Sequence, residues 1–287
     1  QEARSWLQRA RGIASTDLFD VAQIDLYRSV LDVRDNSGFE EPVASMGSSS
    51  WAHDSRVVVM VPCDDAEYFD ALVARMRDTW VVPVGCQLQF QRCSERGRGR
   101  AFQTVLNNGA ADVLIVIQRV AEAVSPDFLY QMLQSLEVHD VISVAGASRW
   151  VRSHWRGDEF GRKTAGFMVE ARDAEGLYDV QCLGNQMGLV TGEQAVLDGV
   201  LLGIRVDKMP HTDFDDELLG VGWALEEDWV YRVGQAGAKL AVHRGLGLLV
   251  REMPAQERHE RYPGLLRLQE KYNFPLFSMD ADDGMVL

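Results

Sequence analysis

Short runs of apolar residues alternate with amphipathic stretches through the middle of this chain. The continuous apolar runs at 56–61 and 112–117 are typical of strands that are buried on both faces. Between them, apolar residues recur at helical spacing from Phe69 to Met76 and again around Phe102. Strands that alternate with helices predict an α/β domain with a mostly parallel central sheet, whose ligands bind beyond the carboxyl ends of the strands.

Turn and capping residues set the expected ends of these elements. Pro62 and Asp64 end the first strand, and the sequence Asn107-Asn108-Gly109 ends a helix with a glycine cap. Ser125-Pro126-Asp127 reads as an N-cap, a first-turn proline and a first-turn acid, and so predicts a helix with four inward apolar residues. Those residues are Leu129, Met132, Leu133 and Leu136. Further strands are expected at 87–91 and 141–145.

A later segment combines an apolar strand, an acidic loop and the start of a helix. The strand-like run at 197–205 is followed by the acidic loop at 214–218 and by a helix expected to begin at 222–223. Three consecutive carboxylates at 226–228 then fall in its first turn, where the helix dipole favours their charged form. A charged carboxylate in that place can serve as a general base.

The N-terminal residues differ from the rest of the chain. Residues 17–31 carry apolar side chains at near-helical spacing after Thr16, a candidate N-cap, and 43–50 resembles a linker. We therefore expect a helical extension and linker over 1–50 and one main domain over 51–287.

Composition excludes several classes of protein. The net charge of −14 and the pI of about 4.9 argue against non-specific nucleic-acid binding, which needs a basic face. Four cysteines without CxxC spacing indicate reduced thiols in a cytoplasmic setting, with no zinc site. No apolar run approaches the roughly 18 residues of a membrane-spanning helix, and no signal peptide is evident.

The order of these elements resembles that of a GT-A glycosyltransferase of the broad family-2 type over roughly residues 56–250. It is most similar to a subgroup in which a Val-Ala-Gly segment, here at 144–146, leads into a tryptophan-containing loop, here Trp150 to Gly157. The matching residues are Val61-Pro62, Asn107-Asn108-Gly109, Ser125 to Leu129, Asp198-Gly199, Phe214 to Leu218, Gly222-Trp223 and Ala236-Gly237. The resemblance implies a GT-A fold and transfer of a sugar from a nucleotide diphosphate to an acceptor hydroxyl, a hexosyltransferase-type activity.

One position departs from the family pattern. The acidic motif that holds Mg²⁺ or Mn²⁺ against the donor diphosphate would fall on Gln118-Arg119-Val120, where Arg119 replaces the carboxylate. In one interpretation Arg119 itself neutralises the diphosphate and transfer needs no metal. In the other, activity is lost and a catalytically silent GT-A domain binds a nucleotide, a glycan or a protein.

The resemblance also implies roles for individual residues. Among the three acids, Glu227 is the first candidate for the base that activates the acceptor, ahead of Glu226 and Asp228. Acids in a first helical turn are also favourable without any catalytic role, and Asp228 with Arg232 makes an ordinary i,i+4 pair. The expected donor-binding residues are Pro62, Asp64, Arg100, Gln118, Arg119 and Asp198, and the acceptor-binding residues are Trp155 and Trp223.

Several of these residues have a plain structural alternative. Asp198-Gly199 is a common turn pair, Asp64 can cap the following helix, and the basic residues from Arg92 to Arg100 can form a solvated loop. A UDP- or GDP-sugar is the expected donor, and a glycan, lipid-linked molecule or protein the acceptor, with no certain cofactor and Mg²⁺ or Mn²⁺ disfavoured. A nucleotidyltransferase would need a glycine-rich loop, which Pro62-Cys63-Asp64-Asp65 is not.

Overall fold

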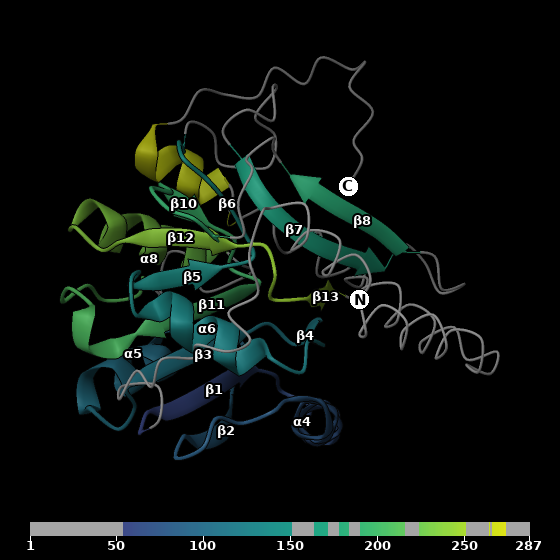
Figure 1. The fold of residues 1–287 in the computed structure, drawn as a ribbon. Coiled ribbons are helices and arrows are strands. Elements are labelled where there is room, and N and C mark those ends of the chain that lie inside the picture. Colours follow the sequence, from purple (N-terminus) through teal and green to yellow (C-terminus); the bar gives the residue numbers. More distant parts are fainter. Residues whose placement is uncertain are drawn as a thin grey trace.

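The computed structural model describes the central α/β part of the chain (Figure 1). The described residues are 54–150, 164–171, 178–183, 190–215, 224–250, 264 and 266–273, with the backbone alone at 164–171 and 178–183. The expected helix at 17–31, the linker at 43–50, most of the acidic loop at 214–218, and Trp155 and Trp223 lie outside these residues.

A seven-stranded sheet forms the centre of the described part. Its strands are β1 (Arg56–Pro62), β2 (Gln87–Cys93), β3 (Val113–Ile117), β5 (Val141–Ser143), β9 (Val190–Thr191), β11 (Leu201–Arg205) and β12 (Leu240–His243). They are ordered β2-β1-β3-β11-β5-β12-β9. Strand β1 is parallel to β2 and β3, and β12 is parallel to β5, whereas β11 is antiparallel to both β3 and β5. Five strands therefore share one direction, which confirms the mostly parallel sheet.

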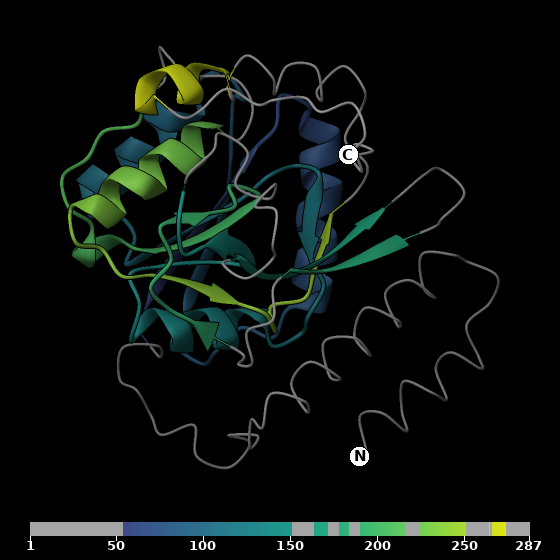
Figure 2. The ribbon, with the colours of Figure 1, turned by 90° about the horizontal axis from the view of Figure 1, so that it is seen from above.

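Helices cover both faces of this sheet (Figures 1 and 2). Helices α4 (Ala66–Thr79) and α6 (Phe128–Leu136) pack in the apolar cluster that contains Val59 and Ile115. Helices α5 (Arg98–Asn108) and α8 (Ala224–Gln235) share the opposite cluster with Met60 and Val116, and lie side by side there. Alternate residues of β1 and β3 thus enter opposite clusters, as the period of a strand requires.

A second sheet lies beside the first. It contains β4 (Ala121–Ala123), β6 (Ala145–Ala147), β7 (Thr164–Ala171), β10 (Val196–Leu197) and β13 (Leu248–Val250), and β8 (Tyr178–Leu183) pairs with β7. The order along the sheet is β10-β6-β7-β13-β4. A short 3₁₀ helix at Val206–Lys208 follows β11, and residues 266–272 form the C-terminal helix of the described part.

Most of the expected elements are present, with small shifts at their ends. Strands β1, β2 and β3 and helix α4 agree with the sequence prediction. Helix α5 ends at Gly109, whose φ of 63° is the left-handed conformation that glycine adopts without strain. The N-cap residue of helix α6 lies two residues later than expected, at Asp127 rather than Ser125, and Ser125 Oγ donates to the Asp127 carboxylate.

Two predicted strands are wrong because each is in fact two strands. The expected strand at 141–145 divides at Val144, so that β5 belongs to the seven-stranded sheet and β6 to the second sheet. The expected strand at 197–205 divides at Asp198-Gly199 into β10 and β11, again in different sheets. The residues at both crossings are buried. The turn pair Asp198-Gly199 marks the second crossing, whereas no turn residue marks the first one at Val144.

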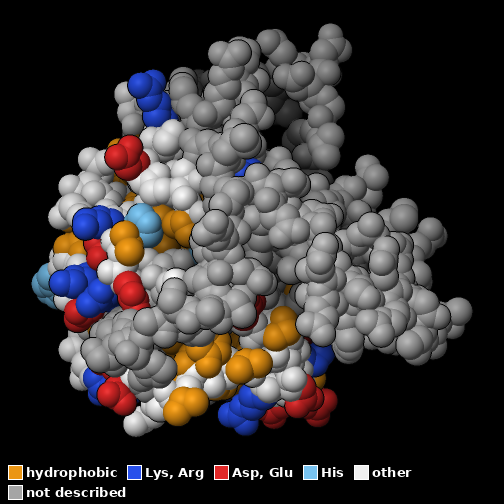
Figure 3. All heavy atoms as spheres, viewed as in Figure 1, with side chains coloured by type: hydrophobic (Ala, Val, Ile, Leu, Met, Phe, Trp, Pro, Cys, Tyr) orange, Lys and Arg blue, Asp and Glu red, His pale blue; other side chains and the backbone are white. Residues whose placement is uncertain are grey.

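Charges of both signs lie on the face drawn in Figure 3. There, the Lys and Arg side chains of the described part lie among the Asp and Glu side chains. Cys63, Cys86 and Cys93 form no disulfide bond within the described part of the chain. In the described part, no helix combines the length and the apolar character needed to cross a membrane.

Gly146 offers a test of how closely the second sheet is packed. A Cβ at this position would lie 2.5 Å from the Val196 carbonyl oxygen, a backbone atom that cannot move aside alone. We expect Gly146→Ala to lower the free energy of unfolding by about 1–3 kcal/mol. The measurement is urea denaturation followed by circular dichroism.

Gly97→Ala is the matched control for this prediction. A Cβ at Gly97 meets no heavy atom within 4 Å, so only a small change in helix capping remains, below about 1 kcal/mol. Equal losses of stability in the two variants would contradict the close approach at Gly146.

Candidate functional site

The candidate site lies where β1 and β3 end. The two strands are parallel neighbours, so their carboxyl ends bring Pro62 to Asp64 near Gln118 and Arg119, as expected for a ligand-binding edge. Tyr68 on α4 donates a hydrogen bond to the Arg119 carbonyl oxygen at 2.8 Å. Helix α4 is thereby attached to the end of β3.

A buried ion pair connects the two helices that flank this edge. Arg98, in the first turn of α5, and Glu226, in the first turn of α8, are 4% and 0% exposed. Arg98 Nε lies 2.7 Å from Glu226 Oε1, and Nη2 lies 3.3 Å from Oε2. A third donor, Nη1, reaches the Glu95 carbonyl oxygen at 2.9 Å. The fork of the guanidinium therefore fixes the carboxylate in both position and orientation.

Gln118 completes this buried cluster from the end of β3. Its Nε2 donates to Glu226 Oε1 at 3.0 Å and to the Gly199 carbonyl oxygen at 3.2 Å. Burial raises the pKa of the Glu226 carboxyl above its ordinary value, and Arg98 and Gln118 partly offset that rise. Desolvation has the largest effect on this pKa, so it opposes the charged form that a helix N-terminus is expected to favour.

Arg119 is engaged by a neighbouring acid. Its Nε lies 2.7 Å from Glu95 Oε1, and the two side chains are 30% and 39% exposed. Glu95 lies in the short loop between β2 and α5. An anion that binds the Arg119 guanidinium at this edge has to share it with the Glu95 carboxylate or displace that carboxylate.

Asp228 faces a different set of partners from Glu226. It is fully buried and accepts hydrogen bonds from Arg232 Nε at 2.8 Å and from the Tyr272 hydroxyl at 2.6 Å. Lys271 Nζ lies 2.7 Å from its Oδ1. Burial raises the pKa of Tyr272, and the hydrogen bond to Asp228 adds to that rise. Asp228 therefore holds α8 to the C-terminal helix, and its expected i,i+4 pair with Arg232 is present.

Glu227 lies between these two acids in the sequence and is also 0% exposed. Successive residues of an α-helix project about 100° apart, so Glu227 shares neither the Arg98 contact of Glu226 nor the Lys271 contact of Asp228. The three acids are adjacent in the sequence, but their side chains project in different directions from the helix.

The other expected donor residues have mainly structural contacts. Pro62 is buried at the end of β1, and Asp64 is exposed with its carbonyl oxygen bonded to Arg92 Nη1 at 2.8 Å. Asp198 is fully buried, and its Oδ1 accepts from the Val200 N–H at 2.9 Å. This hydrogen bond within the Asp198-Gly199 turn agrees with the structural alternative given for Asp198.

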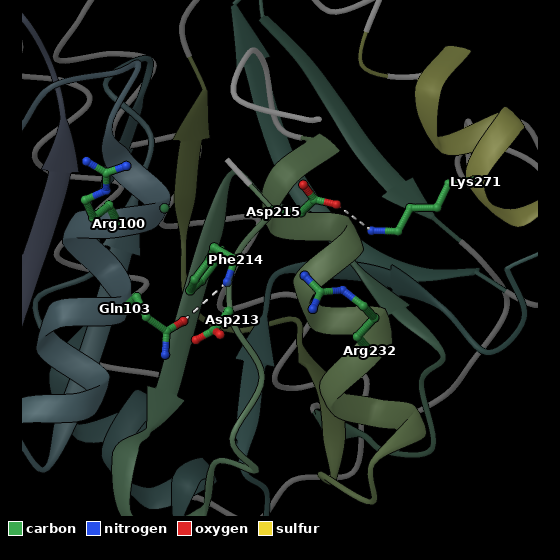
Figure 4. A pocket seen from close by; sticks show the side chains of 8 residues that line it. Arg100, Gln103, Asp213, Phe214, Asp215, Arg232 and Lys271 are labelled. Atoms are coloured by element: carbon green, nitrogen blue, oxygen red, sulfur yellow. Dashed lines mark hydrogen bonds and ion pairs between the residues drawn. The ribbon is translucent and has the colours of Figure 1, made fainter. Parts of the chain in front are cut away.

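Arg100 has different surroundings from Arg119. It lines a pocket of about 480 Å³ to which Arg119 does not contribute (Figure 4). The pocket is formed by α5, the segment 213–215, α8 and the C-terminal helix, and Asp215 is paired there with Lys271 at 3.0 Å. The basic run from Arg92 to Arg100 is therefore not one clamp. Arg92 bonds a loop carbonyl, Arg98 bonds a buried carboxylate, and Arg100 lines this pocket.

Sequence reasoning missed Arg98 as the partner of Glu226, and also missed Glu95, Lys271 and Tyr272. Arg98 and Glu226 are 128 positions apart, and no local pattern relates them.

A divalent cation does not fit the residues at the end of β3. Gln118 offers an amide that is already bonded to Glu226, and Arg119 offers a cation. Within the described ranges, no group of three or more His, Cys, Asp or Glu residues is placed to hold a metal ion.

Comparison with known proteins gives only distant structural likenesses. No protein-family model matches the chain, and no curated protein does. Among solved structures, a mannosyltransferase from Pyrobaculum calidifontis in complex with GDP-Man and Mn²⁺ has a TM-score of 0.47 at 11% identity, covering 89% of this chain and 74% of its own.

Two further structures are similar at a lower level. GalNAc-T7 with UDP, GalNAc and Mn²⁺ has a TM-score of 0.39 at 10% identity, over 70% of this chain and 44% of its own. The CMP:2-keto-3-deoxy-manno-octonic acid synthetase complexed with CTP has a TM-score of 0.33 at 12% identity, over 75% of this chain and 100% of its own. Likenesses of this strength establish neither a family nor an activity for this chain.

The Arg98–Glu226 pair makes a stability prediction. We expect Arg98→Met to lower the free energy of unfolding by about 3–5 kcal/mol, because it leaves a buried carboxylate without its cation. The double variant Arg98→Met/Glu226→Met removes both charges, so it should recover a large part of that loss. Denaturant titration of the two single variants and the double variant measures the coupling. Additive losses would show that the two charges are not coupled.

Proposed function

We propose that this chain is a GT-A glycosyltransferase that moves a sugar from a nucleotide diphosphate to an acceptor hydroxyl without a metal. The observation that carries the proposal is the buried Arg98–Glu226–Gln118 cluster, which brings the acid-bearing turn of α8 against the end of β3. In this proposal, a cation for the leaving group and a carboxylate for the acceptor both come from residues near this edge of the sheet.

Arg119 is the proposed group for the donor diphosphate. A guanidinium offers a fork of donors that matches phosphate oxygens and stays charged at neutral pH. It is one-third exposed at the ligand-binding edge, and Glu95 holds it there. When the diphosphate departs, this positive charge would stabilise the negative charge that develops on it.

Glu227 is the proposed base for the acceptor hydroxyl. Both oxygens of Glu226 are engaged by Arg98, and Asp228 is engaged by three side chains, so these acids position α8. Because Glu227 is fully buried, an acceptor reaches it only when adjoining chain moves aside. The proposed donors are UDP- and GDP-sugars, and the proposed acceptors are glycans, lipid-linked molecules or proteins.

A catalytically silent binding domain is the second candidate. It is favoured by the same burial of all three acids and by the Arg119–Glu95 pair, since each group that chemistry requires already has a protein partner or no solvent access. This candidate predicts binding of a nucleotide, a glycan or a protein without transfer.

Donor binding is tested by titration calorimetry with UDP-glucose, UDP-N-acetylglucosamine and GDP-mannose, each with Mn²⁺ and with EDTA. We expect one donor to bind equally well in both conditions. Arg119→Ala should weaken that binding at least about tenfold, because it removes charge-assisted hydrogen bonds to the diphosphate. Failure of all three donors to bind, or binding that EDTA abolishes, would contradict the proposal.

Glu95→Gln is the matched variant in the same titration. It releases Arg119 from an exposed ion pair of modest strength, so donor affinity should rise about twofold to fivefold. Glu67→Gln, which changes an exposed acid in the first turn of α4, controls for net charge and should leave the affinity unchanged.

The role of Glu227 is tested by turnover. For a donor that binds, we expect Glu227→Gln to abolish the release of nucleotide diphosphate, whether the sugar passes to an acceptor or to water. The dissociation constant of the donor should change less than about twofold, because a base acts on the acceptor and not on the donor. Release of nucleotide diphosphate is the measurement. Binding of a donor by the wild-type chain without any turnover would favour the silent domain.

A further inference from the structure

The pocket between α5 and α8 is distinct from the cluster around Glu226. Helix α5 contributes Arg100 and Gln103 from one side, and α8 and the C-terminal helix contribute Arg232 and Lys271 from the other (Figure 4). The segment 213–215 lies between them. The volume of about 480 Å³ is in the range of small-molecule sites, roughly 300–1,000 Å³.

The charges around this pocket are balanced. Its three cations, Arg100, Arg232 and Lys271, are matched by Asp213 and Asp215 in the lining and by the buried Asp228 behind it. Lys271 Nζ lies 3.0 Å from Asp215 and 2.7 Å from Asp228, and Arg232 is bonded to Asp228. A phosphate or nucleotide gains no net attraction from such a lining, because each added anion meets as much negative as positive charge.

The lining nevertheless offers many hydrogen-bonding groups. Guanidinium and ammonium groups donate, and carboxylates accept, so hydroxyl groups, which do both, fit between them. The exposed Asp213 carboxylate makes no hydrogen bond or ion pair with the rest of the described chain. It can therefore accept from a ligand without breaking an existing bond.

Phe214 adds an apolar surface to this polar lining. Its ring stacks on Trp229 with centroids 4.7 Å apart and meets Phe102 edge-on, and its N–H donates to Gln103 Oε1 at 3.3 Å. The ring is thus held rigidly while it lines the pocket. An aromatic surface beside paired donors and acceptors matches a sugar ring, which has C–H groups on its faces and hydroxyls at its rim.

We propose that this pocket binds a neutral sugar unit, a monosaccharide or part of an oligosaccharide. The carboxylates of Asp213 and Asp215 accept from its hydroxyls, Arg100 donates to them, and Phe214 contacts its apolar side. The proposal does not require that the chain transfer a sugar, since Arg98 and Glu226 bond each other in the buried cluster and neither lines the pocket.

The test is an array of neutral and acidic oligosaccharides, followed by calorimetry with the best neutral probe in the absence of nucleotide. We expect the wild-type chain to bind at least one neutral probe. Asp213→Ala should weaken that binding at least about tenfold, because it removes a charged acceptor from the sugar hydroxyls. Asp213 is exposed, so the variant should fold normally, which circular dichroism verifies.

Asp78→Ala is the control, because Asp78 is an exposed acid on α4, on the opposite face of the sheet. Its affinity for the probe should equal that of the wild type. Binding of acidic probes alone, binding of no probe, or equal affinity in the Asp213 variant and the wild type would each overturn the proposal. Because donor titration is a separate measurement, a failure here leaves the proposed transferase activity unaffected, and the converse also holds.

Discussion

The ion pair between Arg98 and Glu226 is the interaction on which the candidate site depends. It joins the first turn of α5 to the first turn of α8, and Gln118 extends it to the end of β3. Removing two charges from water is costly, and this cost is recovered only when the geometry is good and the remaining donors are satisfied. Here both carboxylate oxygens and all three guanidinium nitrogens have partners. Helix α8 is thereby joined to α5 and to the end of β3, which lie more than 100 residues earlier in the chain.

The helical repeat explains why three adjacent acids do not act as a group. Glu226 faces α5, whereas Asp228 faces Arg232 and the C-terminal helix through Lys271. Glu226 and Asp228 thereby hold α8 against two different neighbours. Two of the three candidate bases thus contribute to the packing of this helix on two of its sides. Catalysis, in this view, is left to the acid between them.

Much of the fold could be predicted because its signals are local. Continuous apolar runs identified β1 and β3, and Gly109 marked the end of α5 through a backbone conformation that glycine favours. The crossing at Val144 could not be predicted, because the buried chain passes there from one sheet to another without a turn residue. At the second crossing, the turn pair Asp198-Gly199 indicated a turn but not that the two strands belong to different sheets. The sequence placed candidate acids on the right helix. It could not indicate which of them meets Arg98, since that pairing exists only after the sheet has formed.

The reversed strand β11 changes what the ligand-binding edge is made of. Because β11 runs against β3, it begins where β3 ends, and the turn at Asp198-Gly199 lies at the same edge as Gln118. The Gly199 group that Gln118 contacts is a backbone carbonyl, which every amino acid possesses, so its presence is independent of the side chain at 199. What evolution can alter is the shape of the turn, and the Asp198 carboxylate that bonds the Val200 N–H maintains that shape. A buried acidic side chain can thus shape a candidate binding edge by holding the backbone of the turn beside it.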